Sequence, residues 1–185
     1  MASTPSLSMA RIGDDDVREG LAEHLARLWR YAFVLSRRRD YAEDLVQATC
    51  VRALEKSHQF TPGSRLDRWL FTILHSIWLN DVRSRNAHRT ESLDFHEEQG
   101  AHDGVGIAET TVRARQVLRQ VEDLPDGQRA AIFLVCVEGF AYREAAEILK
   151  VPIGTIMSRI ASARAKLADM AAEPVHRSTS KVDKR

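Results

Sequence analysis

The chain has 185 residues, a formal net charge of +1 at pH 7, and only 6% aromatic residues. A charge this close to zero excludes a uniformly basic nucleic-acid coat, so any nucleic-acid contact must come from locally clustered cations. Sparse glycine and proline beside abundant Ala, Leu, Arg and Glu predict an all-α protein. No long apolar stretch and no signal-peptide pattern occur, so we expect a cytoplasmic protein without membrane insertion.

The N-terminal half, residues 14–89, is predicted to form one small helical domain behind a disordered lead at 1–13. Aspartates at 14–16 suit the start of a first helix, whose apolar side comprises Leu21, Leu25, Leu28, Ala32 and Leu35. A second helix is expected at about 41–57. A break at 61–64, with the sequence TPGS, precedes a long helix at about 65–86. Cys50 in this half and Cys136 in the next lie within helical patterns, so we expect two buried thiols.

Residues 90–108 lose the helical periodicity and are rich in acidic residues and glycine, which indicates a flexible acidic linker. A second small helical domain is predicted at 109–170, with helices at about 109–122, 127–138, 141–149 and 152–170. Gly139 is well placed to end the second of these helices. The polar and basic tail at 173–185 is expected to be disordered.

Residues 142–166, YREAAEILKVPIGTIMSRIASARAK, have the pattern of a helix-turn-helix DNA reader. The second helix has a buried stripe with steps of three and four, formed by Ile153, Ile156, Ile160, Ala163 and Leu167. Its opposite face comprises Thr155, Ser158, Ser162 and Ala165, flanked by Arg159 and Lys166. Small polar residues let a helix approach base edges, and the flanking cations contact phosphates. An ordinary pair of amphipathic helices has the same apolar pattern, so this segment alone leaves both interpretations open.

Two further surfaces are predicted in the N-terminal half. The outward face of the second helix comprises Asp44, Gln47, Ala48, Val51 and Glu55. An outward valine among polar residues suits a partner surface, although a single exposed valine is also ordinary. The outer side of the long helix comprises Arg68, Thr72, His75, Ser76 and Arg83, with Asn80 at its edge. Polar edges and cations are what an opened DNA strand requires.

Three stretches, at 41–54, 60–85 and 124–167, resemble a known family in its order and spacing. They are similar to the DAEDLVQETFLRAW segment, the WLFRIARN segment and the LPxxxR-plus-reader segment of bacterial extracytoplasmic-function sigma factors. This is the minimal class with sigma regions 2 and 4 only. The resemblance implies a non-enzymatic initiation factor, acting in a stress response, that binds core RNA polymerase and directs it to promoters. Region 2 would dock on the polymerase and melt the −10 element, and region 4 would read the −35 duplex.

The resemblance also implies roles for individual residues. The polymerase-binding set is Asp44, Gln47, Val51 and Glu55; the −10 set is Phe60, Ser64, Arg65, Arg68, Thr72, Ser76, Asn80 and Arg83; the −35 set is Thr155, Ser158, Arg159, Ser162, Arg164 and Lys166. The implied partners are core RNA polymerase, promoter DNA and an anti-sigma factor. No cofactor, metal or catalytic residue is expected. Relatives often have a basic residue where Met157 and Ser162 stand, so we expect weak promoter binding without polymerase.

Two other functions remain as alternatives. A dimeric DNA-binding regulator would bind a palindrome without polymerase. A sigma mimic would sequester a sigma regulator without reading DNA. An enzyme is the least favoured reading, because no nucleophile–base pair or phosphate-binding glycine loop occurs. His96, Glu97, Glu98 and His102 fall in the predicted linker, where solvated side chains explain them better than a metal site.

Overall fold

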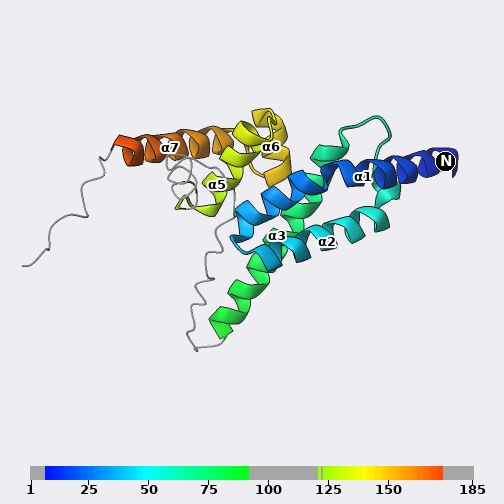
Figure 1. The fold of residues 1–185 in the computed structure, drawn as a ribbon, viewed down its shortest axis with the longest axis horizontal. Coiled ribbons are helices and arrows are strands. Elements are labelled where there is room, and N and C mark those ends of the chain that lie inside the picture. The colour runs from blue at the N-terminus through cyan, green and yellow to red at the C-terminus, as the bar shows by residue number, and fades with distance from the viewer. Residues whose placement is uncertain (1–6, 92–120, 122, 173–185) are drawn as a thin grey trace, which may run out of the picture.

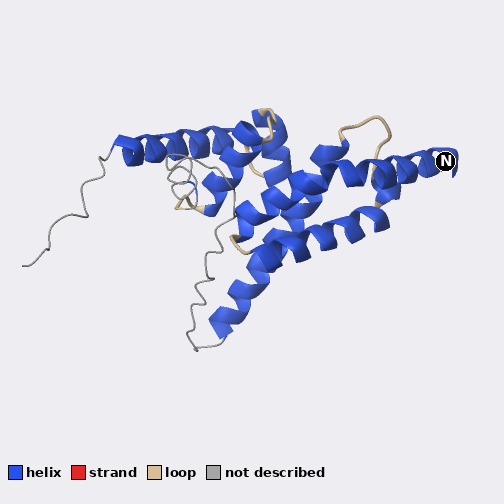
Figure 2. Cartoon of the chain, viewed as in Figure 1, coloured by secondary structure: helices blue, strands red, loops and turns tan. Residues whose placement is uncertain are grey.

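A computed structural model describes residues 7–91, 121 and 123–172. Every regular element in these ranges is helical, which confirms the predicted all-α class (Figure 2). The elements are α1 Leu7–Ser36, α2 Arg39–Glu55, a 3-10 turn Ser57–Gln59, α3 Leu66–Glu91, α5 Asp126–Ile132, a π-helical turn Phe133–Val137, α6 Tyr142–Leu149 and α7 Ile153–Ala172. None of the helices within the described part of the chain is long and apolar enough to cross a membrane.

The helices α1 and α2 form a tight hairpin. Arg37 has a positive φ of 59°, and its N–H donates to the Phe33 carbonyl at 2.8 Å, which ends α1 and reverses the chain. The two helices then lie side by side (Figure 1). Contrary to the sequence prediction, α1 begins at Leu7, so the aspartates at 14–16 lie inside the helix and do not cap it. Asp15 and Asp16 are exposed and lie on the solvent side of the helix, whereas Asp14 is half-buried and the following Val17 is buried.

The helix α3 completes the N-terminal half. Gly63 before it has a φ of 77°, a conformation that favours glycine, and the Ser64 N–H donates to the Thr61 carbonyl at 3.0 Å. Leu70, Phe71, Leu74 and Trp78 of α3 are buried against α1 and α2. The C-terminal part of α3 runs to Glu91, beyond the predicted end near 86, and projects away from the other helices (Figure 1).

The C-terminal half contains the predicted helix-turn-helix. The helix expected at 127–138 consists of α5 and the π-helical turn, and Gly139 follows with a φ of 75°. Lys150 ends α6 in the left-handed conformation, with φ 53° and ψ 47°. Its N–H donates to the Glu147 carbonyl at 3.2 Å, and the Val151 N–H donates to the Ala146 carbonyl at 3.0 Å. This turn lets α7 pack across α6 and α5, with Ile156 buried.

The two halves share one continuous apolar core. Tyr31 of α1 stacks on Phe133 with ring centroids 5.6 Å apart, and both halves contribute side chains to the same buried cluster. The linker predicted at 90–108 lies outside the described residues from position 92 on, as do the tail at 173–185 and the residues of the disfavoured metal site. Of the two thiols expected to be buried, Cys50 is half-buried and Cys136 is exposed, because the π-helical turn places Cys136 on the solvent side.

Candidate nucleic-acid and partner interfaces

The outward face of α2 is a mixed apolar and acidic patch. Asp44, Gln47, Val51 and Glu55 are all exposed, and Val51 exposes 51% of its surface. The opposite face of α2, with Leu45 and Ala53, is buried, so the helix is fixed in this orientation. Leu54 is also exposed beside this patch, and sequence analysis missed it. Its spacing of three residues from Val51 was the signal that could have found it.

The predicted −10 face of α3 is partly covered. Asn80 and Arg83 are exposed, whereas Thr72 and Ser76 are half-buried. The Thr72 hydroxyl donates to the Arg68 carbonyl at 2.8 Å, and the Ser76 hydroxyl donates to the Thr72 carbonyl at 2.7 Å. The exposed part of this face therefore lies toward the projecting end of α3.

His75 belongs to the core and not to the outer side where the sequence placed it. It is 6% exposed, and its Nδ1 lies 3.0 Å from the Tyr31 hydroxyl. Burial, with the nearby charges of Arg159 and Lys150, lowers the pKa of His75 to about 4. The prediction failed because periodicity describes α3 alone, whereas in the folded chain His75 packs against Tyr31 of α1.

The predicted site residues in the loop before α3 differ in their exposure to solvent. Phe60 is buried and tilts against Trp69 with centroids 5.4 Å apart, so its ring is part of the core. Ser64 is exposed, and its hydroxyl donates to the Thr61 carbonyl at 2.7 Å. Arg65 is exposed but bound to two carboxylates, because it donates to Asp67 and to Glu144, each at 2.7 Å.

The reading face of α7 is exposed over most of its length. Ser158, Ser162, Arg164 and Lys166 are exposed and Thr155 is half-buried. Arg159 instead lies over α5: a Cβ added at Gly127 would come within 2.9 Å of the Arg159 Cζ. The exposed apolar side chains of Ile153 and Met157 border this face. Ile153 was predicted to lie in the buried stripe, but it is exposed because it is the first residue of α7 and lies at the open end of the helix. Met157 was not part of the predicted face.

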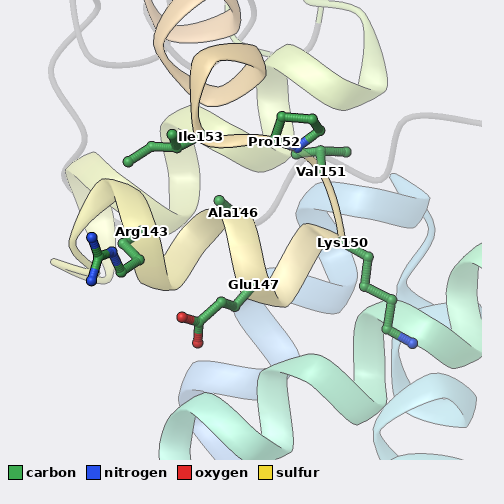
Figure 3. Close-up of a pocket in the computed structure, with 7 residues that line it drawn as sticks. All are labelled: Arg143, Ala146, Glu147, Lys150, Val151, Pro152 and Ile153. Atoms are coloured by element: carbon green, nitrogen blue, oxygen red, sulfur yellow. The ribbon is translucent and has the colours of Figure 1, made fainter.

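The turn of the helix-turn-helix lines an open pocket of about 450 Å³. Figure 3 shows Glu147 and Lys150 projecting toward the helices of the N-terminal half, and Pro152 and Ile153 on the other side. The pocket is open to solvent, and its charged lining residues are Arg143, Glu147 and Lys150. Such an open shape differs from the enclosed, mostly apolar sites that bind small molecules.

Taken together, the arrangement defines a two-part helical DNA-binding protein. One part presents a small, polar reading helix on a helix-turn-helix, and the other presents a cationic helix face beside a separate apolar patch. Comparisons with known proteins identify the family. Residues 21–88 match the family described as Sigma-70 region 2, and residues 114–167 match Sigma-70, region 4.

Relatives of known identity agree over most of the chain. The ECF RNA polymerase sigma factor EcfG of Rhodopseudomonas palustris (strain TIE-1) is 35% identical over 161 residues, which cover 83% of this chain and 84% of that protein. The sigma factor RpoE of Bartonella quintana, solved in complex with the anti-sigma factor NepR, is 32% identical with a TM-score of 0.68; the match covers 84% of this chain and 96% of that one. CnrH, solved in complex with the cytosolic domain of CnrY, shares the fold, with a TM-score of 0.61 at 24% identity, over 88% of this chain and 94% of that one.

The chain therefore belongs to the extracytoplasmic-function sigma factors of RNA polymerase, which confirms the resemblance found in the sequence. It is a promoter-directing transcription factor, and the sigma-mimic and dimeric-regulator alternatives are not favoured.

Proposed function

We propose that this sigma factor divides its work among three surfaces: α2 binds core RNA polymerase, the loop and outer face around α3 hold the opened −10 strand, and α7 reads the −35 duplex. The observation that carries the proposal is the α7 surface, where exposed Ser158, Ser162 and Lys166 lie opposite the buried Ile156 and Ile160. Small side chains allow close approach to base edges, and the lysine supplies a phosphate contact.

The polymerase contact is supported by the chemistry of the α2 patch. Val51 and Leu54 are exposed apolar side chains on a helix whose other face is already buried. Exposed apolar residues ringed by Asp44, Gln47 and Glu55 have the composition of a protein interface with a polar rim.

The −10 assignment depends on cations and polar groups near α3. Arg65 and Arg68 lie at its N-terminal end, and Asn80 and Arg83 lie on its exposed later turns. Together they form a path on which guanidinium groups bind phosphates and the amide binds a base edge.

An anti-sigma factor is the third proposed partner, and the cytoplasm is the proposed location. The support is that RpoE, 32% identical to this chain, was solved with its anti-sigma factor NepR. Here the exposed Val51 and Leu54 in one half, with Ile153 and Met157 in the other, would supply apolar contact area for such a partner.

The test is run-off transcription with purified core polymerase and a library of short promoters, with core polymerase alone as the control. We expect transcripts that depend on this protein and are restricted to templates sharing two spaced elements. Absence of transcripts despite binding to core polymerase would contradict promoter direction. Absence of binding to core polymerase would contradict the assignment of α2.

A further inference from the structure

Two arginines of the proposed −10 surface are already bound within the chain. Arg65 Nη1 lies 2.7 Å from Glu144 Oε1, and Arg68 Nη1 lies 2.9 Å from Glu147 Oε2. Both glutamates belong to α6, the first helix of the helix-turn-helix. The Arg65 guanidinium also lies over the Phe140 ring, 5.1 Å from its centroid. The C-terminal half thus pairs with cations that a DNA strand would contact.

A third glutamate extends this contact to α1. The Glu138 side chain is only 2% exposed, and its two carboxylate oxygens accept from Arg27 Nε at 2.6 Å and from Arg30 Nη2 at 3.3 Å. Residues 138–147 therefore carry a row of three carboxylates, each paired with arginine from the N-terminal half. The three glutamates pair with arginines of α1 and with arginines at the start of α3. The charge complementarity therefore extends over a surface and is not limited to a single ion pair.

We propose that the segment 138–147 is an intramolecular competitor of the −10 DNA strand. The carboxylates of Glu144 and Glu147 each accept from one Nη1 of Arg65 and Arg68, and phosphate oxygens would accept from the same N–H groups. In the closed state the surface is masked, and the chain must separate its two halves before it holds promoter DNA. The inference rests on the proposed −10 assignment of Arg65 and Arg68.

The energetics suit a reversible mask. Ion pairs that remain partly exposed stabilise weakly, so a polyanion together with polymerase can displace them. The aromatic contacts of Phe140 with Phe71 and of Phe133 with Tyr31 keep the free chain closed. A binding site that is open only part of the time has an apparent affinity reduced by the open fraction. The mask thus gives a physical reason, separate from cation number, for the weak DNA binding that we expect of the free protein.

The first test is binding of a fluorescent single-stranded DNA oligonucleotide to the full chain carrying E144Q and E147Q. Glutamine at 144 keeps the acceptor for the Ala141 N–H, which now bonds the Glu144 side chain at 2.9 Å, so α6 keeps its start. The matched control is E19Q with E23Q on the exposed side of α1, which changes the net charge equally. We expect about fivefold tighter binding for the α6 variant than for the control. Equal affinities would overturn the proposal.

The second test measures closure without DNA. Spin labels on Cys136 and on an S84C substitution, in a C50A background, report the distance between the halves. We expect E144Q with E147Q to add a longer-distance population. The exchange variant R65E, R68E, E144R and E147R should restore the native distance, because the pairs re-form with the charges reversed. Its oligonucleotide binding should be weaker than that of the wild type, because positions 65 and 68 then carry carboxylates. An unchanged distance in the glutamine variant would overturn the mask.

These outcomes separate the mask from the proposed function. If the halves open but the oligonucleotide binds no tighter, Arg65 and Arg68 are not DNA contacts and the mask is wrong as stated. If run-off transcription fails although opening and tighter binding occur, the promoter function fails and the mask stands.

Discussion

Phe71 of α3 and Phe140, which lies just before α6, meet edge to face with ring centroids 5.2 Å apart. Both rings are buried, and the guanidinium of Arg27 lies within 5.9 Å of each centroid. In this closed conformation the contact joins regions 2 and 4, since each ring fills space that the other half would leave open. The relative placement of the two halves is therefore part of the folded core and bears on stability as well as on DNA access.

Arg129→Met should destabilise the chain strongly. Arg129 is 1% exposed; its Nε donates to the Val34 carbonyl at 2.6 Å and its Nη1 to the Leu124 carbonyl at 2.7 Å. Methionine fills similar volume but leaves both carbonyls without this donor. We expect a loss of about 2–4 kcal/mol in the free energy of unfolding, measured by urea denaturation.

The control for Arg129 is Arg39→Met, which removes an exposed pair with Glu43 one helical turn away. Such a pair contributes about 0.5 kcal/mol. Equal losses in the two variants would mean that the buried arginine does not link α1 to α5.

The stability of the chain should fall in mild acid because of His75. Its pKa lies at about 4 when folded, against 6.5 as the ordinary value, because burial disfavours the charged ring. The unfolded chain binds a proton near pH 6.5 that the folded chain rejects until about pH 4. The His75 contribution is therefore complete above pH 6.5, declines between pH 6.5 and 4 by up to about 3 kcal/mol, and is constant below.

Comparing the wild type with His75→Gln isolates this contribution, because carboxylates titrate in both proteins. The glutamine variant should be the less pH-sensitive over this window in urea denaturation. His58→Gln, at an exposed position, should follow the wild-type curve. Parallel curves for the wild type and His75→Gln would contradict a neutral, buried His75.

Val51→Glu should weaken binding to core polymerase without unfolding the chain. Val51 exposes half of its surface, so a glutamate there costs no more than about 0.5 kcal/mol of folding stability. A charge in the apolar centre of an interface should reduce affinity by about tenfold or more, measured by fluorescence anisotropy with labelled protein. Val137→Glu, at another exposed valine in the C-terminal half, is the matched control, and an equal loss there would remove α2 as the docking surface.

Lys166→Ala and Ser158→Ala should affect promoter binding in different ways. Lys166 is exposed at the side of the proposed reading face of α7, where we propose that it contacts phosphates. Its loss should therefore weaken holoenzyme binding equally for all sequences. The slope of log affinity against log salt should fall by about one. Ser158→Ala should leave the slope unchanged and relax the preference within the −35 element. A change of preference by Lys166→Ala alone would reverse these roles.

Local sequence patterns specify most of the helical structure of this protein. Apolar residues at steps of three and four specify where helices form and which side they bury, as Ile156 and Ile160 do in α7. Backbone signals specify the breaks, and Gly63 and Gly139 both adopt the positive φ that glycine favours. The faces of α2 and α7 could be predicted for the same reason, since a helix with one buried stripe leaves its other side exposed.

How the two halves meet depends on packing between helices that are distant in the sequence. Phe71 and Phe140 are distant in sequence, and an apolar stripe does not specify which partner will cover it. For that reason the sequence pattern placed His75 on an outer face, whereas packing buries it. The same pattern gave no sign that Arg65 and Arg68 are paired with Glu144 and Glu147. Periodicity reports contacts along one helix. The burial of a histidine or the pairing of an arginine depends on the side chains that another helix brings within a few ångströms.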